Sequence, residues 1–100
     1  MPTYVTLYKL TDQGIRNIRE APQRIDAGIA AWEKAGGKMI GFYATTGEYD
    51  YVVITEAPNE DLGVAFTLAQ GSMGNVRTTT MRAYTRGEFA DLVSKLPPVG

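Results

Sequence analysis

Cysteine and histidine are both absent from the 100 residues of this chain. Without cysteine, the chain can form no disulfide and has no thiolate nucleophile. Without histidine, it lacks the commonest general base, the commonest zinc ligand and the usual proximal haem ligand. Thiol catalysis is therefore excluded, and we expect the protein to use no metal and no cofactor.

An excess of charge of one sign and long apolar runs are also missing. The formal net charge is −1 at pH 7, which is not typical of a protein that binds nucleic acid or an anionic membrane. The first residues lack a basic segment followed by an apolar one, and no apolar run approaches the length needed to cross a bilayer. We therefore expect a soluble, cytoplasmic protein with neither a nucleic-acid nor a membrane partner.

The apolar residues follow two different periods along the chain. Strict alternation predicts strands, whereas apolar residues spaced three or four apart predict amphipathic helices. Pro22 interrupts the first helical pattern, so we expect a kink or a restart near Ala21. The predicted strands are residues 3–10, 38–45, 49–56 and 75–85. The predicted helices begin after Thr11 or Asp12, after Asn59 and after Thr85, and they end at Gly36, near Gly71 and before Pro97.

This order of elements is β-α-β-β-α-β followed by a terminal helix, which is the ferredoxin-like plan. Right-handed crossovers then give an antiparallel sheet with the strand order 4-1-3-2 and both long helices on one face. The sequence therefore predicts an α+β fold in one domain, residues 1–100, with an extra C-terminal helix. Two such sheets placed face to face would form a dimeric α/β barrel.

Alternation along the strands assigns the side chains to two faces of the sheet. We expect the helices to cover Val5, Leu7, Val52, Ile54, Met81 and Ala83. The opposite face then carries Tyr4, Thr6, Tyr8, Tyr51, Val53, Thr55, Val76, Thr78, Thr80, Arg82 and Tyr84. This mixture is too apolar for bare water, so it indicates an interface, with a second copy of the chain as the natural partner. Aromatic side chains on such strands also stack bases in RNA-recognition modules, but the basic and glycine residues of that module are missing.

A cluster of charged residues is expected at one end of the sheet. In the predicted strand order, Lys9 lies between Asp50 and Arg77, and their alternation points all three toward the helices. Tyr49 and Asn75 lie in the neighbouring loops. These five residues are candidates to bind an anionic or carbonyl-bearing small molecule, with Asp50 orienting the cations or moving a proton. The alternative is a structural ion network that stabilises the strand ends.

Three stretches carry a family resemblance: Y-V-T-L-Y-K-L-T, G-F-Y-A-T-T-G-E-Y-D and G-N-V-R-T-T-T. Together they resemble the GYD domain family, which is named for the glycine and the Tyr-Asp pair found here as Gly47, Tyr49 and Asp50. The resemblance implies a ferredoxin-like, dimeric α/β-barrel fold, and it implies no established activity. The wider group includes cofactor-free monooxygenases, lactone isomerases, haem-dependent dismutases and ligand-sensing domains of transcription regulators.

Three functions are consistent with these features. The first is a homodimeric protein, or a higher homo-oligomer, that binds a small organic molecule in the polar pocket at the end of the sheet. The second is a cofactor-independent enzyme, similar to a monooxygenase or an isomerase, that acts on a small carbonyl metabolite. The third is a structural or interaction module whose exposed sheet face is its working surface.

Overall fold

The fold is α+β, as predicted, in a computed structural model that describes residues 1–99. Gly100, the last residue of the predicted domain, lies outside the described residues. The elements in chain order are β1 (Thr3–Leu10), α1 (Asp12–Arg16), the short 3-10 helix η1 (Ile18–Glu20), α2 (Ala21–Lys34), β2 (Lys38–Ala44), β3 (Tyr51–Glu56), α3 (Glu60–Ser72), β4 (Val76–Ala83) and α4 (Arg86–Ser94).

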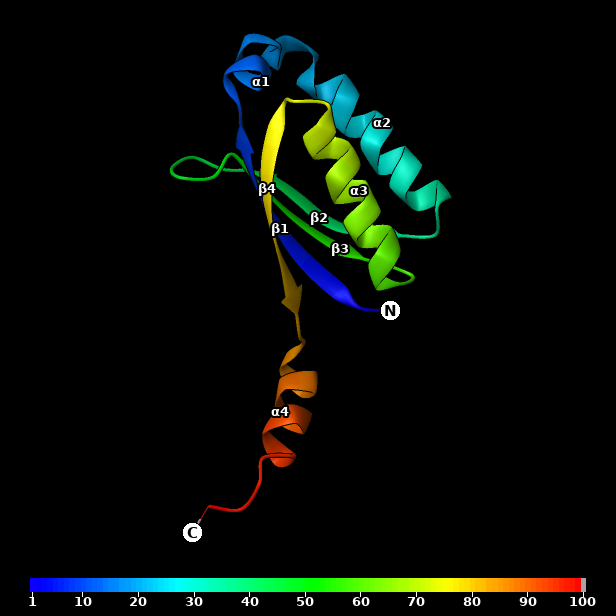
Figure 1. Ribbon diagram of the computed structural model, residues 1–100, viewed down its shortest axis with the longest axis vertical. Helices are drawn as coiled ribbons and strands as arrows, with labels where there is room; N and C mark the ends of the chain where they lie inside the picture. Colours follow the sequence, from blue (N-terminus) through cyan, green and yellow to red (C-terminus); the bar gives the residue numbers. More distant parts are fainter. Residues whose placement is uncertain (100) are drawn as a thin grey trace.

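The four strands form one antiparallel sheet in the order β2-β3-β1-β4, which is the predicted order read from the other edge. Helices α2 and α3 lie on one face of this sheet, and no helix formed by residues 1–99 lies on the other face (Figure 1). The ferredoxin-like plan with its extra C-terminal helix is thereby confirmed. Within the part of the chain that the structure describes, no helix is both long and apolar enough to span a membrane.

Local sequence signals place the ends of the elements. Thr11 caps α1 by accepting a hydrogen bond from the backbone of Gly14, and Asn59 caps α3 in the same way. The predicted restart of the first helix near Ala21 is confirmed, because α2 begins there with a proline in its first turn. Thr85 and Glu88 form the predicted capping box at the start of α4.

The prediction of which sheet face meets the helices is wrong. Thr6 and Val53 are register partners on β1 and β3, and both are buried beneath α2 and α3. Because side chains alternate along a strand, Leu7 and Val52 lie on the uncovered face. The alternation of side chains along a strand determines which residues share a face. Because both faces of this sheet are partly apolar, the alternation does not show which face the helices cover. We call the uncovered surface of Val5, Leu7, Tyr43, Val52, Ile54 and Met81 the open face.

The space between the helices and the sheet is only partly filled. Four apolar residues among residues 1–99 are buried, namely Ala21, Trp32, Val53 and Ala57. Trp32 connects the two helices, since its ring meets that of Phe66 edge-on with 4.9 Å between centroids. Three of the four buried apolar side chains are small or medium-sized, so the helices do not close tightly on the sheet.

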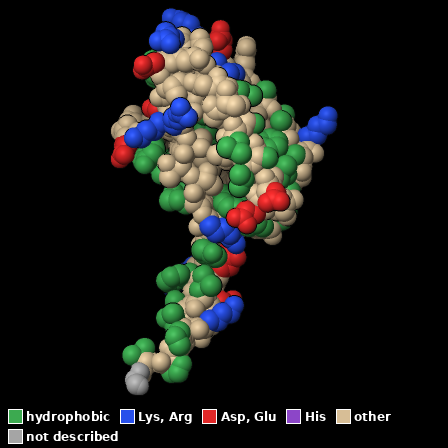
Figure 2. Space-filling view, viewed as in Figure 1, with side chains coloured by type: hydrophobic (Ala, Val, Ile, Leu, Met, Phe, Trp, Pro, Cys, Tyr) green, Lys and Arg blue, Asp and Glu red, His purple; other side chains and the backbone are tan. Residues whose placement is uncertain are grey.

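Helix α4 extends the molecule to a length of 57 Å and lies beyond the end of β4, away from the sheet (Figure 1). None of its residues is buried. Hydrophobic side chains are visible along its surface in Figure 2, and Phe89, Leu92 and Val93 are 43% to 60% exposed. An amphipathic helix gains most of its stability by packing its apolar side, so α4 lacks the contacts that such a helix ordinarily makes.

Candidate functional site

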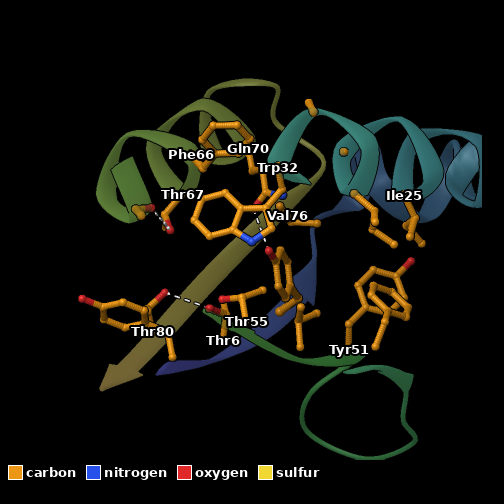
Figure 3. A pocket seen from close by; sticks show the side chains of 18 of the residues that line it. Thr6, Ile25, Trp32, Tyr51, Thr55, Phe66, Thr67, Gln70, Val76 and Thr80 are labelled. Carbon is orange, nitrogen blue, oxygen red and sulfur yellow. Dashed lines mark hydrogen bonds between the residues drawn. The ribbon is translucent and has the colours of Figure 1, made fainter. Parts of the chain in front are cut away.

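A cavity of about 740 Å³ lies between the sheet and the two long helices. Its sheet wall carries side chains of β1, β3 and β4, including Thr6, Thr55 and Thr80, and its opposite wall carries Trp32 and Phe66 (Figure 3). Volumes of about 300 to 1,000 Å³ are typical of small-molecule sites. The helix–sheet interior is therefore a candidate binding site.

Small residues on the helices make room for this cavity. Gly28 of α2 and Gly63 of α3 both line it, and each lies on the helix stripe that faces the sheet. A Cβ atom added at Gly28 would meet no heavy atom within 4 Å. A packed core would carry a leucine or a valine at Gly28, so this glycine leaves space that neighbouring side chains do not fill. At Gly63 an added Cβ would meet side-chain atoms of Ala57 and Tyr4 at 3.9 and 4.0 Å.

Two pairs of neutral polar side chains in the cavity are hydrogen-bonded to each other. The hydroxyl of Tyr8 donates to Oε1 of Gln70 at 2.6 Å, and the hydroxyls of Thr6 and Thr80 lie 3.3 Å apart (Figure 3). Burial raises the pKa of Tyr8 above its usual value of 10.0, although the bond to Gln70 opposes this effect. Tyr8 is therefore a neutral hydroxyl at physiological pH and not a base.

Aromatic rings occupy both walls. On the sheet, Tyr51 lies between Tyr8 and Phe42, with ring centroids 6.1 and 5.2 Å away. On the helices, Trp32 and Phe66 form the edge-on pair described above. The sheet rings and the helix rings enclose the cavity from opposite sides.

Charged side chains line the cavity only where solvent also reaches them. Arg24 forms an ion pair with Glu20 at 3.6 Å, and its side chain is 31% exposed. Glu60 and Arg82 are both exposed, and the guanidinium of Arg82 lies over the ring of Tyr84 at 4.5 Å. The deeper part of the cavity is therefore aromatic, aliphatic and neutral-polar.

The predicted charged cluster lies at the end of the sheet but not toward the helices. Lys9 and Arg77 are direct register partners on β1 and β4. Lys9 shares the outward direction of Leu7, and it pairs with Glu48 at 3.5 Å. The expectation that the three charges point toward the helices is wrong for the same reason as the face assignment, because both rest on the same alternation.

Asp50 forms backbone hydrogen bonds at this end of the sheet. Its Oδ2 accepts from the backbone N–H of Leu10 at 2.8 Å, and its own N–H donates to the carbonyl of Tyr8 at 2.8 Å. Within residues 1–99, Asp50 forms no ion pair. This arrangement matches the structural alternative, in which the carboxylate stabilises the strand end and the turn before β3.

The other two predicted residues lie on different sides of this end. Tyr49 lies beneath the ammonium group of Lys9, with 5.2 Å between Nζ and the ring centroid. Asn75 lines the cavity, and its Oδ1 accepts from Nε2 of Gln13 at 3.0 Å. The five predicted residues therefore divide into an outward group, with Lys9 and Tyr49 in contact, and one cavity residue, Asn75.

The open face is a second candidate site. Its four valine, leucine and isoleucine side chains are partly exposed, whereas Met81 is 44% exposed and Tyr43, at the edge on β2, is 61% exposed. A contiguous apolar surface of this kind on a sheet is typical of a protein interface. In the described part of the chain, nothing packs on this face.

Comparisons with known proteins agree with this fold. The GYD domain family matches residues 4–93, which confirms the resemblance, and the chain belongs to this family. A relative from Thermus thermophilus, named "Glutamine synthetase and cystathionine beta-lyase binding protein", is 33% identical over 97 residues. The match covers 96% of this chain and 99% of the relative. No solved structure matches the chain at a significant level.

Proposed function

We propose that the protein is a homodimeric interaction module that binds a second copy, and then other proteins, through the open face and α4. The single observation that carries this proposal is an apolar sheet face and an apolar helix that nothing in the described chain covers. The relative's name supports it, because that protein is named for binding two enzymes. The interface is formed by Val5, Leu7, Val52 and Ile54, not by the tyrosines and threonines that sequence alone suggested.

The size of the surface supports the participation of α4. Four strands about 4.8 Å apart and six to eight residues long present a surface roughly 19 Å wide and 20 to 27 Å long, or about 400 to 500 Å². A stable protein interface buries about 800 Å² on each partner. The sheet alone falls short of that value, and the exposed side of α4, with Phe89 and Leu92, supplies additional apolar area.

Charge favours an arrangement in which the two copies lie in opposite directions. Lys9 and Arg77 lie directly opposite each other at one end of the open face, which is unfavourable for like charges. Among residues 1–99, Arg77 has no ion pair. Glu56 lies at the other end of the same face. A twofold axis perpendicular to the strands places Glu56 of one copy near the two cations of the other.

Sedimentation equilibrium tests the homodimer. The expected mass is twice the 10.9 kDa of one chain. Ile54→Asp introduces a charge into the open face and is expected to give single chains. The matched control is Ile15→Asp, because Ile15 is 55% exposed on α1 and lies outside the open face. A single-chain mass for the unmodified protein would contradict the proposal, and so would a dimer that survives Ile54→Asp.

Protein partners are tested with the two enzymes in the relative's name. We propose that glutamine synthetase or cystathionine β-lyase from the source organism binds this chain, because the relative's alignment covers nearly its whole length. Biolayer interferometry with each purified enzyme is expected to give saturable binding that Ile54→Asp weakens and Ile15→Asp does not. Binding by neither enzyme would remove these partners from the proposal without affecting the homodimer.

Small-molecule binding is the second candidate function, and the cavity favours it. We propose that a ligand occupies the helix–sheet cavity, where Asn75 is the one member of the predicted polar site that lines the wall. The other four members of that predicted site then stabilise the end of the sheet or lie at the protein interface, namely Lys9, Tyr49, Asp50 and Arg77. The lining supplies hydroxyls, amides and rings, and its central tyrosine is neutral, which supports binding over proton-transfer catalysis.

A further inference from the structure

We propose that the cavity binds a flat, uncharged, ring-bearing molecule whose oxygen atom accepts a hydrogen bond from the Gln70 amide, which Tyr8 orients. This inference rests on the second candidate function, small-molecule binding, and is independent of any protein partner. It specifies the chemical class of the ligand and the side chains that select it.

The aromatic walls argue for a flat ligand. Tyr8, Tyr51 and Phe42 form a row of tilted rings on the sheet, and Trp32 and Phe66 lie across from them on the helices. Aromatic groups prefer offset or edge-on contacts with other rings. A planar molecule between the two walls makes such contacts on both of its sides, whereas a globular aliphatic molecule does not.

The hydrogen-bonding groups argue for one polar atom on the ligand. The oxygen of the Gln70 amide is bonded to the Tyr8 hydroxyl, which leaves the two amide N–H donors of Gln70 for another acceptor. The oxygen of Tyr8 retains lone pairs for a donor. A carbonyl oxygen on the ligand matches the free N–H donors of Gln70, whereas Tyr8 would accept only from a ligand that also carries a donor.

The absence of deep charge argues against an ionised ligand. The charged residues that line the cavity, Arg24, Glu60 and Arg82, all have solvent access. Transfer of an ion into a neutral, largely apolar site is unfavourable unless a partner charge is present there. The interior therefore selects uncharged molecules, and the volume of about 740 Å³ accommodates two or three rings.

The single tryptophan provides a direct test, because Trp32 lines the cavity and its indole N–H gives one cross-peak in a proton–nitrogen NMR spectrum. Coumarin, naphthalene and coumarin-3-carboxylate are titrated separately. We expect coumarin to shift the Trp32 cross-peak saturably. Naphthalene has a similar shape but no oxygen, and is expected to bind about fivefold more weakly. Coumarin-3-carboxylate carries a charge and is expected to cause no saturable shift.

Three variants locate the site. Gly28→Leu adds a side chain in the open space of the cavity and is expected to abolish coumarin binding. Gly71→Leu is the matched control, because it makes the same change in α3 at a position with equally open surroundings outside the cavity lining. Gln70→Leu is expected to weaken coumarin about fivefold and to leave naphthalene unchanged.

The outcomes separate the two levels of the proposal. If coumarin-3-carboxylate binds at least as tightly as coumarin, the uncharged class is wrong but small-molecule binding stands. If no probe shifts Trp32, both the class and the cavity as a ligand site are wrong. If coumarin binds equally to the parent and to folded Gly28→Leu, the ligand lies elsewhere. Equal losses for coumarin and naphthalene in Gln70→Leu would overturn the hydrogen-bonding role.

Discussion

Val52 and Val53 are neighbours in the sequence but occupy two different surfaces of one sheet. Val53 is 4% exposed under the helices, beside a cavity whose walls are rings and hydroxyls. Val52 faces the other way, onto a surface that no described residue covers. The covered face has helices above it and still leaves room for a small molecule, whereas the open face is apolar and has no described element above it.

This difference indicates a division of roles between the two faces. A cavity lined by hydroxyls and aromatic rings suits a small molecule, because polar atoms inside it can orient a ligand. An apolar sheet face gains free energy when another large apolar surface covers it. Substitutions on the two faces should therefore have different kinds of effect.

The largest effect on stability is expected from Trp32→Ala. Trp32 is 7% exposed, contacts Phe66 and donates to the carbonyl of Lys38 at 3.2 Å, so its removal should lower the free energy of unfolding by about 3 to 5 kcal/mol. Urea unfolding measures this loss. Tyr43→Ala on the open face is the comparison, and its expected cost is within about 1 kcal/mol at low protein concentration. Similar losses for both variants would contradict the contrast between the faces.

A pair of glycine substitutions should change stability in opposite directions. In Gly37→Ala the added methyl would lie 2.1 Å from Cε2 of Trp32, so we expect a loss of about 1 to 3 kcal/mol. In Gly28→Ala the methyl enters open space within α2, and we expect a gain of about 0.5 to 1 kcal/mol from the reduced entropy of the unfolded chain. Thermal unfolding measures both. A loss in Gly28→Ala would indicate that the space at this position is filled.

Apolar substitutions on α4 should affect assembly more than folding. Phe89 is 60% exposed and no residue of α4 is buried, so Phe89→Ser should leave the unfolding of the single chain nearly unchanged. The same change should weaken the homodimer by about tenfold, because it removes roughly 1 to 2 kcal/mol of apolar burial. Sedimentation velocity across a dilution series measures the dimer. A large loss of single-chain stability would show that α4 packs on its own chain.

The smallest effect concerns pH. Burial raises the pKa of Tyr8 in the folded state, so the unfolded chain loses that proton first as the pH rises. The contribution of Tyr8 is therefore complete below its unfolded pKa of about 10 and decreases as the pH rises toward the folded value. Urea unfolding between pH 8 and 11 should show a decline that is smaller in Tyr8→Phe. A decline in Tyr8→Phe as large as in the parent would contradict this role of Tyr8.

Most of the fold could be predicted from local signals in the sequence. Capping residues such as Thr11, Asn59 and Thr85 act through hydrogen bonds within three residues, so they are visible without the tertiary structure. Strand order followed from the element order, because crossovers have a fixed hand. The identity of the covered face could not be predicted in this way. Strand β1 carries apolar side chains at both Leu7 and Tyr8, so neither set of alternating positions is clearly polar.

The candidate site was harder to predict than the fold. Lys9 and Arg77 are register partners at one end of the sheet, but assigning the wrong set of alternating positions to the helix side gave the wrong direction for their side chains. The cavity was missed in the sequence because it is created by small side chains, whereas the predicted site was built from charged and reactive side chains. Gly28 and Gly63 in otherwise apolar helix stripes were the available signal, since a packed core seldom places glycine there.

The most direct test of the proposed division between the two faces is an isotope-filtered NMR experiment on a mixture of ¹³C-labelled and unlabelled chains. It detects proton contacts between the methyl groups of one copy and the atoms of another. We predict intermolecular contacts from the methyl groups of Val52, Leu7 and Ile54 and none from the methyl groups of Val53. Intermolecular contacts from Val53, or contacts from neither valine in a sample shown to be dimeric, would contradict the account.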